Sequence, residues 1–384
     1  MQNERKRILD MLENGVINAE EALLLLENLG KDQQAKNAQL PTEQPKRQSA
    51  QEEPKTDFGG TSYNGNESKT GSKDEDFFED IRRDFNQFGD RFMQFVQSAV
   101  EKVKGFDFDR PFGEPVEFHH SVTKDFSNFN EISVDIANGK LELYPSEENG
   151  VRAECHVKAY RQSSPEEAKK EFLEKFLFVE DGQKLRLVND MKMFQTNVVL
   201  YVPHKDYEAF NGRLFNGAFK LSELKIDRLK VKTANGKIEV RGLNFKDADF
   251  ETANGSVQLQ EVTGEQLEVE TLNGRVYVDG NVKEVEAQSI NGHVVVTTKD
   301  TSARKIDARA VAGSVELYIP SGVPINGEIA SNFGKMDLQL TDITRVNESE
   351  QFLQKSIKFS KDGEGTPLVV FGEAKTGSVL VRYS

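Results

Sequence analysis

The chain has 384 residues and a formal net charge of −14. This acidic balance argues against a nucleic-acid partner, because binding to phosphates requires a basic surface. Cys155 is the only cysteine, which excludes an intramolecular disulfide and a cysteine-based metal cluster.

The first residues are charged and lack the apolar core of a signal peptide, and no run of 18 apolar residues occurs in the sequence. We therefore expect a cytoplasmic protein, with association at a membrane surface left open. Display at the cell surface without a signal peptide is the alternative.

Residues 1–30 predict a helical hairpin. One apolar stripe ends at Gly15, and Asn18 with Glu21 forms a capping-box-like start for a second stripe that ends at Gly30. Helices this short are marginal alone, so we expect the hairpin to pair with a second copy or to dock on another protein. The alternative is a self-capping hairpin without a binding role. The predicted contact residues are Ile8, Met11, Leu12, Leu25, Leu26 and Leu29.

Residues 31–73 are rich in Gln, Lys, Pro, Ser, Asn and Gly, which predicts a disordered linker. Residues 74–105 then predict one long amphipathic helix with an aromatic stripe. The stripe consists of Phe78, Ile81, Phe85, Phe88, Phe92, Phe95, Ala99 and Val103. Three roles are open for it: a cap packed on the rest of the fold, self-association as a coiled coil, or contact with a membrane surface.

A phrase of about 19 residues recurs four times between residues 229 and 296. Each copy has apolar residues in alternation on both sides of an Asn-Gly pair, the pattern of two strands joined by a turn. The pairs are Asn235-Gly236, Asn254-Gly255, Asn273-Gly274 and Asn291-Gly292. Repeats of fixed length can stack so that each residue lies on its own copy one repeat away. The sequence therefore predicts a mainly β protein, with a parallel β-solenoid of about 19-residue rungs over residues 114–384. The Asn and Gly residues of the turns would form a structural turn ladder. Independent hairpins in a sandwich are the alternative.

Less regular β segments flank these copies. Residues 132–145 predict an early rung, residues 151–160 a strand with Cys155 in its apolar column, and Ser164 caps a helix that reaches about Phe176. Strands are also expected at KLRLV and NVVLYVP, and two Asn-Gly pairs lie between residues 208 and 221. Beyond residue 296 we expect rungs at 306–317 and 329–340, a loop over 341–366 and a final half-rung near the end.

The sequence contains no nucleotide-binding loop, nucleophile elbow or zinc-protease helix. His119 and His120 are neighbours in a strand and point to opposite faces, so no metal site is predicted. Some solenoids are polysaccharide-active enzymes, which would need clustered catalytic groups on one outer face. The expected outward residues change character from rung to rung, and no carboxylate pair is expected to recur on successive rungs. They include Lys237, Glu239, Gln258, Arg275, Tyr277, Asp279 and His293. We therefore predict no catalytic residue, no metal and no cofactor.

Two resemblances to known families add to this interpretation. The N-terminal hairpin resembles the SHOCT-like helical module of bacterial proteins, which is thought to mediate oligomerisation. The matching residues are Ile8, Met11, Leu12, Gly15, Ile17, Ala19, Glu20, Glu21, Ala22, Leu25, Leu26 and Leu29. Residues 116–384, with the strand Val198 to Pro203 and the repeated Asn-Gly rungs, resemble the bacterial β-strand-repeat family whose members are labelled "putative adhesins". Together the two parts resemble the LiaX-related envelope-stress proteins of Firmicutes.

These resemblances imply a β-solenoid fold and a role in the cell envelope. Our leading hypothesis is a non-catalytic interaction or scaffold protein of the bacterial envelope-stress response. In it the hairpin supplies oligomerisation or regulator docking, and the solenoid binds a protein, a peptide or an envelope polymer. The alternatives are a carbohydrate-active enzyme that uses the solenoid face, and a surface-displayed adhesin or antimicrobial-peptide sensor.

Overall fold

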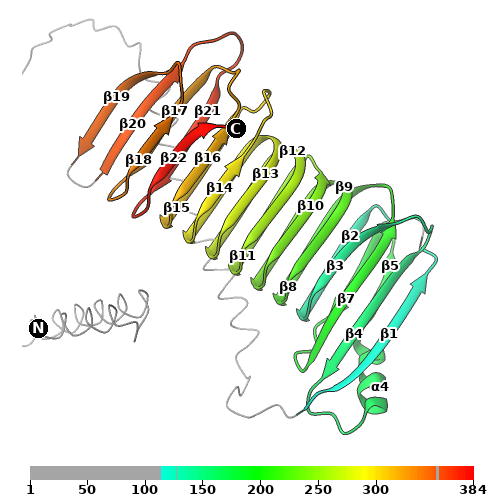
Figure 1. The fold of residues 1–384 in the computed structure, drawn as a ribbon. Helices are drawn as coiled ribbons and strands as arrows, with labels where there is room; N and C mark the ends of the chain where they lie inside the picture. The colour runs from blue at the N-terminus through cyan, green and yellow to red at the C-terminus, as the bar shows by residue number, and fades with distance from the viewer. Residues whose placement is uncertain (1–113, 127, 352–353) are drawn as a thin grey trace, which may run out of the picture. The chain divides into compact units, whose positions relative to one another are not determined.

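In the computed structural model, the described residues are 114–126, 128–351 and 354–384 (Figure 1). The predicted hairpin, linker and amphipathic helix lie outside them. The described part of the chain is almost entirely β, and none of its helices is long and apolar enough to cross a membrane.

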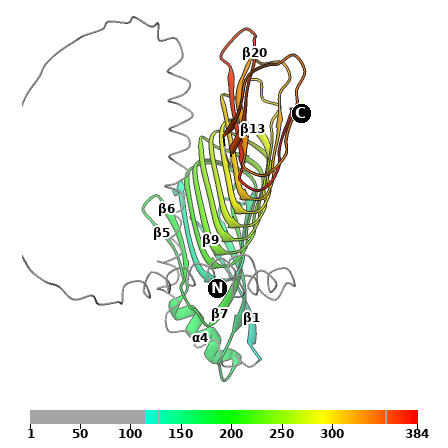
Figure 2. The same cartoon turned by 90° about the vertical axis from the view of Figure 1, so that its left-hand side faces the viewer.

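The strands form a parallel β-solenoid with two rows, which we call row A and row B (Figures 1 and 2). Each rung is a row-A strand, a tight turn and the row-B strand that follows it. The long strands β9 (Phe219–Asn235), β12 (Val257–Asn273) and β13 (Val276–Asn291) bend from row B into row A.

Row A contains, in spatial order, β5 (Leu177–Asp181), β6 (Lys184–Asn189), β2 (Glu131–Asn138), β8 (Asp206–Asn216), β9, β11 (Asp247–Asn254), β12, β13, β15 (Lys305–Ala312), β21 (Leu368–Ala374), β17 (Ile325–Ser331), β20 (Gln354–Lys361) and β19 (Thr344–Gln351). Row B contains β1 (Val116–Lys124), β4 (Val151–Ala159), β7 (Phe194–Pro203), β3 (Leu141–Ser146), β9, β10 (Ile238–Asn244), β12, β13, β14 (Val294–Thr297), β16 (Val315–Ile319), β22 (Val379–Tyr383) and β18 (Met336–Gln339).

The core lies between the two rows. Because side chains alternate along a strand, every second residue faces inward and stacks on its counterpart one rung away, about 4.8 Å distant. One such row-B column consists of Ile238, Val257, Val276, Val294, Val315 and Val379, all fully buried. The copies of the repeat pair in parallel, so the solenoid prediction is confirmed and the sandwich of hairpins is wrong.

Several local predictions are also confirmed. Helix α4 (Pro165–Lys175) begins after Ser164, whose Oγ accepts a hydrogen bond from the Glu167 backbone N–H at 3.2 Å. Strand β4 alternates buried and half-buried residues, with Cys155 in its buried column. Of the two Asn-Gly pairs near residue 214, only Asn216-Gly217 forms a turn, whereas Asn211-Gly212 lies inside β8.

The predicted loop over 341–366 is wrong, because β19 and β20 form an antiparallel hairpin that pairs with β17. This hairpin covers the row-A edge of the solenoid, and its polar sequence lacks the apolar alternation used to recognise a rung. The predicted final half-rung is also wrong. Strands β21 and β22 make a complete rung, and it lies between the rung β15–β16 and the rung β17–β18.

Candidate functional site

The Asn-Gly pairs lie one above another at the turns between row A and row B. Each Asn donates from Nδ2 to the Oδ1 of its neighbour, as from Asn254 to Asn235 at 2.8 Å and from Asn273 to Asn254 at 2.8 Å. A Cβ at Gly255 would lie 2.0 Å from the carbonyl oxygen of Gly236, so only glycine fits. The same geometry holds at Gly236, Gly274 and Gly292, and Asn291 donates to Asn273 at 2.8 Å. Since the Asn amides hydrogen-bond to one another, the ladder stabilises the stack of rungs, which we call the rod.

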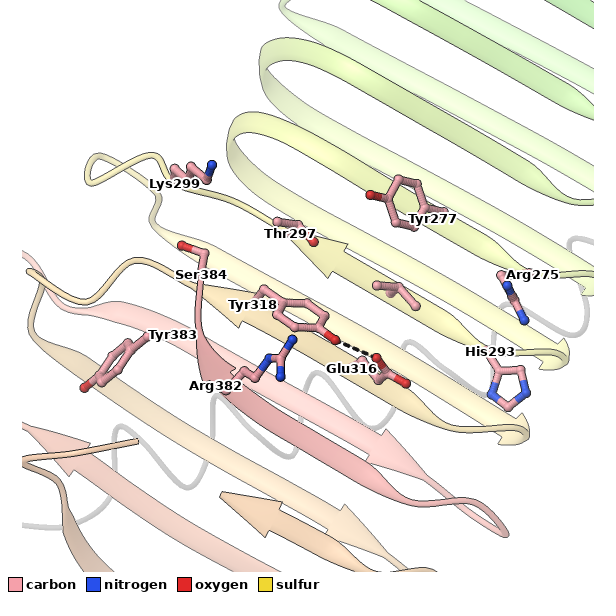
Figure 3. Close-up of a pocket in the computed structure, with 11 residues that line it drawn as sticks. Arg275, Tyr277, His293, Thr297, Lys299, Glu316, Tyr318, Arg382, Tyr383 and Ser384 are labelled. Atoms are coloured by element: carbon pink, nitrogen blue, oxygen red, sulfur yellow. Dashed lines mark hydrogen bonds between the residues drawn. The ribbon is translucent and has the colours of Figure 1, made fainter. Parts of the chain in front are cut away.

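A hollow lies on the outer side of row B, over β13, β14, β16 and β22 (Figure 3). Tyr277 of β13 and Tyr318 of β16 are bulky, whereas Val295 and Thr297 of the intervening strand β14 are short. Short side chains between tall ones leave a depression of ≈ 740 Å³. That volume lies in the range typical of small-ligand sites. The lining residues are Arg275, Tyr277, His293, Val295, Thr297, Lys299, Glu316, Tyr318, Arg382, Tyr383 and Ser384.

The polar groups of this hollow hold one another in place (Figure 3). The Tyr318 hydroxyl donates to Glu316 Oε2 at 2.8 Å, and the Arg382 guanidinium lies 4.4 Å from the centre of the Tyr318 ring. The hydrogen bond to Glu316 and the partial burial raise the pKa of the Tyr318 phenol, so that hydroxyl remains a hydrogen-bond donor at neutral pH.

The lining favours an anionic ligand that carries hydroxyl groups. Arg275, Lys299 and Arg382 are exposed cations, and Glu316 is the one side-chain carboxylate among the lining residues. This local excess of positive charge contrasts with the net charge of −14 on the whole chain. Tyrosine rings with guanidinium groups suit stacking and charge-assisted hydrogen bonds.

A second, smaller hollow of ≈ 240 Å³ continues the first along the rod. It shares His293 and Glu316 with the main hollow and adds Lys335, Asp337 and Gln339 at its far side. The two together form a surface that crosses several rungs, which suits an extended ligand better than a compact one.

Sequence reasoning located part of this hollow. Of the outward residues predicted, Arg275, Tyr277 and His293 line it, whereas Lys237, Glu239, Gln258 and Asp279 are not among its lining residues. Tyr318, Glu316 and Arg382 were missed. The alternation in β16 places Glu316 and Tyr318 outward, so both could have been predicted from the sequence. The position of Arg382 could not, because it depends on the order in which the rungs stack.

The expectation that carboxylates do not recur on successive rungs is wrong. On the outer side of row A, Asp249 and Glu251 of β11 lie beside Glu268 and Glu270 of β12. Lys232 of β9 pairs with Glu251. Glu270 is only 8% exposed, and its burial, followed by the charges of Glu268 and Glu251, raises its pKa to about 9.

The remaining candidates for chemistry are structural. Burial raises the pKa of the Cys155 thiol to about 12, which leaves it unreactive. His119 stacks on His156 with ring centres 4.5 Å apart, while His120 contacts Phe172 of α4 at 5.8 Å on the other side of β1. Among the described residues no group of three or more His, Cys, Asp or Glu side chains is arranged to hold a metal ion.

Parallel rungs with an Asn-Gly ladder along their central turns define a β-solenoid repeat protein. The chain belongs to the Toastrack DUF4097 family, whose model matches residues 129–364. A SHOCT-like domain model matches residues 3–34, which agrees with the resemblance of the N-terminal segment.

The chain is 32% identical over its whole length to the uncharacterized protein YvlB of Bacillus subtilis (strain 168), which it also covers completely. Among solved structures, it is similar to a "putative adhesin" from Bacteroides fragilis NCTC 9343, with 14% identity and a TM-score of 0.39 over 69% of this chain and 97% of that one. It is also similar to a "putative lipid binding protein" from Parabacteroides distasonis ATCC 8503, with 12% identity and a TM-score of 0.30 over 70% and 97%. Neither structural likeness is close enough to carry an argument about function.

Proposed function

We propose that this protein is a non-catalytic binding protein of the bacterial cell-envelope stress response. In this proposal the row-B hollow holds an anionic, hydroxyl-bearing envelope polymer, and the N-terminal segment recruits a second copy or a membrane regulator. The observation that carries the proposal is the hollow itself, where Arg275, Lys299 and Arg382 surround the rings of Tyr277 and Tyr318 on an otherwise acidic chain.

The extent of the surface supports a polymer as ligand. Adjacent rungs repeat about every 4.8 Å, so an extended polymer that lies along the solenoid crosses several rungs and can contact each of them. The strands behind the hollow are hydrogen-bonded on both sides, and β16 lies between β14 and β22. A rigid site of this kind lowers the entropic cost of binding.

Binding of the full chain to poly(glycerol phosphate), with neutral dextran as comparison, tests this proposal. Arg382→Gln should weaken binding about tenfold, which corresponds to 1.4 kcal/mol. Arg241→Gln, an exposed arginine on the same side of row B outside the hollow, is the matched control. Equal affinity of Arg382→Gln and the native chain would remove the hollow from the proposal.

A carbohydrate-active enzyme is the competing function. Hydrolysis by the usual route needs a pair of carboxyl groups on either side of the scissile bond, and the lining of the hollow supplies only Glu316 as a side-chain carboxylate. Incubation with cell-wall and plant polysaccharides followed by product analysis separates the two functions. A turnover that is lost in Arg275→Gln or Asp279→Asn would establish the enzyme.

The N-terminal segment supplies the second half of the proposed function. Its match to a SHOCT-like domain and its apolar stripes support self-association or docking on a regulator. Sedimentation of the full chain carrying Leu25→Asp and Leu26→Asp should show a smaller particle than the native chain. Glu27→Gln, off the apolar stripes and outside the residues that match the SHOCT-like module, serves as the control.

Location of the protein in the cell is part of the proposal. We place it inside the cell at the membrane surface, where the hairpin can meet a regulator and the hollow can meet the polymer during its synthesis. Surface display, in which the hollow meets the finished polymer, is the alternative. Protease treatment of intact cells distinguishes the two, because only a displayed rod is cleaved.

A further inference from the structure

The outer side of row A contains side chains that point away from the core and yet are buried. Strand alternation places Gln288, Asp307, Arg309, Glu328, Ala330 and Phe371 on this side, because their neighbours Ala287, Ala308, Ile329 and Val370 face inward. All six outward residues are exposed by 2% or less. On the outer side of row B, in the same rungs, Val295 and Glu316 are half-exposed and Arg382 is exposed.

Described neighbours account for part of this burial, since the Arg309 guanidinium lies 5.1 Å from the centre of the Phe371 ring and also pairs with Asp307. Phe371 and Ala330 are buried without belonging to the hydrophobic core between the rows. Helix α4, the only helix among the described residues, packs on β1 at the opposite end of the solenoid from β17 and β20 (Figure 2). None of the described helices covers this side of row A, which is therefore a candidate docking surface.

The outer side of row A has the features of a docking surface for an amphipathic helix. One outward column next to the turns is apolar, and consists of Ala234, Ala253, Leu272, Ile290 and Val311. Ala234 and Ala253 are buried, again outside the core between the rows. The adjoining columns contain Glu268, Glu270 and Glu286, next to the buried ion pair in which Arg309 donates twice to Asp307 at 2.8 Å.

We propose that the amphipathic segment 74–105 of this same chain docks along the outer side of row A, with its phenylalanine stripe on the apolar column and on Phe371. Its basic residues Arg82 and Arg91, which flank the stripe at 3.6 residues per turn, then lie within reach of the carboxylates of Glu268 and Glu286. Docking of this kind removes a phenylalanine-rich face from water, which favours the docked state.

The dimensions agree with this arrangement. From Phe78 to Val103 the stripe extends about 38 Å at 1.5 Å per residue. The covered side runs from β9 to β17 across six strand spacings, or about 29 Å. The ten residues 106–115 that connect the segment to β1 reach at most about 35 Å when extended. In row B, β1 is four strands from β9, about 19 Å. The axis of a helix docked outside row A lies about 20 Å from row B, about 10 Å for each layer. The direct distance is therefore about 28 Å, which the connection can span when the segment's C-terminal end lies near β9.

Tryptophan fluorescence of the full chain tests this docking, because the native sequence contains no tryptophan. The reporter is Leu272→Trp on the outer side of row A. Its matched control is Gln258→Trp, which lies on the same strand β12 but on the outer side of row B. Adding Phe85→Asp and Phe92→Asp should shift the Leu272→Trp emission to longer wavelength and leave that of Gln258→Trp unchanged. Gln87→Asp with Gln94→Asp adds the same charge off the stripe and should shift neither.

A second measurement covers the case in which the aspartate variant is destabilised. Ile290→Cys is labelled with a maleimide in the folded chain, where buried Cys155 contributes no background. Labelling should be slow, and faster when Phe85→Asp and Phe92→Asp are present while the far-ultraviolet circular dichroism remains that of the β-rod. Equal labelling rates and unchanged emission overturn the proposal. Protection that weakens on dilution also overturns it, because the covering segment would then belong to a second copy. This inference is independent of the ligand proposed for row B.

Discussion

Glu270 gives the clearest pH-dependent prediction. It is 8% exposed in β12, and burial with the nearby carboxylates of Glu268 and Glu251 raises its pKa from 4.5 to about 9. Between these two pH values the folded chain holds a proton that the unfolded chain has released. Stability therefore falls as the pH rises through this window, by at most about 1.4 kcal/mol per pH unit. At pH 7 the cost accumulates to about 3 kcal/mol.

Replacing Glu270 by Gln removes the titrating group and keeps the size of the side chain. The variant should be more stable than the native chain at pH 7, and its stability should change less with pH. Denaturant unfolding followed by circular dichroism at several pH values from 6.5 to 8.5 measures both effects. This range lies above the raised pKa of about 6 of the Asp307 carboxyl, so that group contributes little to the slope.

The matched control is Glu239→Gln, which removes one carboxylate from the outer side of row B. It should leave the pH dependence as it is in the native chain. A native chain whose stability does not fall between pH 6.5 and 8.5, or a Glu270→Gln variant with the native slope, would refute the reasoning.

Three further predictions concern the rod and are checked by unfolding or labelling. Gly255→Ala should destabilise the fold by about 3 kcal/mol, because its Cβ would lie 2.0 Å from the Gly236 oxygen, whereas Gly322→Ala meets nothing within 4 Å and should be neutral in the same denaturation experiment. Asn254→Ala breaks two hydrogen bonds of the ladder and should cost about 1–2 kcal/mol; unchanged stability would mean that the ladder contributes nothing. Cys155 should resist maleimide until the chain unfolds, and rapid labelling of the native chain would contradict its burial.

The parallel fold was predictable because its main constraint is local. When a strand pairs in parallel with its own copy, each column requires the same kind of residue at the same offset from the turn. Thr233, Thr252 and Thr271 illustrate this, since each hydroxyl donates to a glycine carbonyl oxygen near 3.0 Å. A repeated sequence motif therefore indicates parallel stacking directly. The hairpin β19–β20 has no repeated motif, because an edge strand pairs on one side only and is selected for polarity.

The acidic columns were also present in the sequence. Glu251 and Glu270 both precede the turn asparagine by three residues, and Asp249 and Glu268 precede it by five. The outward residues named as candidates all follow the turn, whereas these four carboxylates precede it. The burial of Glu270, in contrast, was not predictable from the repeat, since it depends on packing across the outer side of row A.

The composition of the row-B hollow depends on the exchange of rungs near the C-terminal end of the described chain. Arg382 lies opposite Tyr318 because β22 pairs with β16, and Gln339 of β18 lies one strand further out. Rungs stacked in chain order would bring Gln339 next to Tyr318 and remove the guanidinium from its ring. The apolar columns accept either order, because Val315 can pack on Val379 or on Met336 with similar burial. What favours the exchanged order is the hairpin β19–β20, which pairs antiparallel with β17 and so requires β17 at the outer edge. The strand that covers the end of the rod therefore also determines which cation faces the hollow.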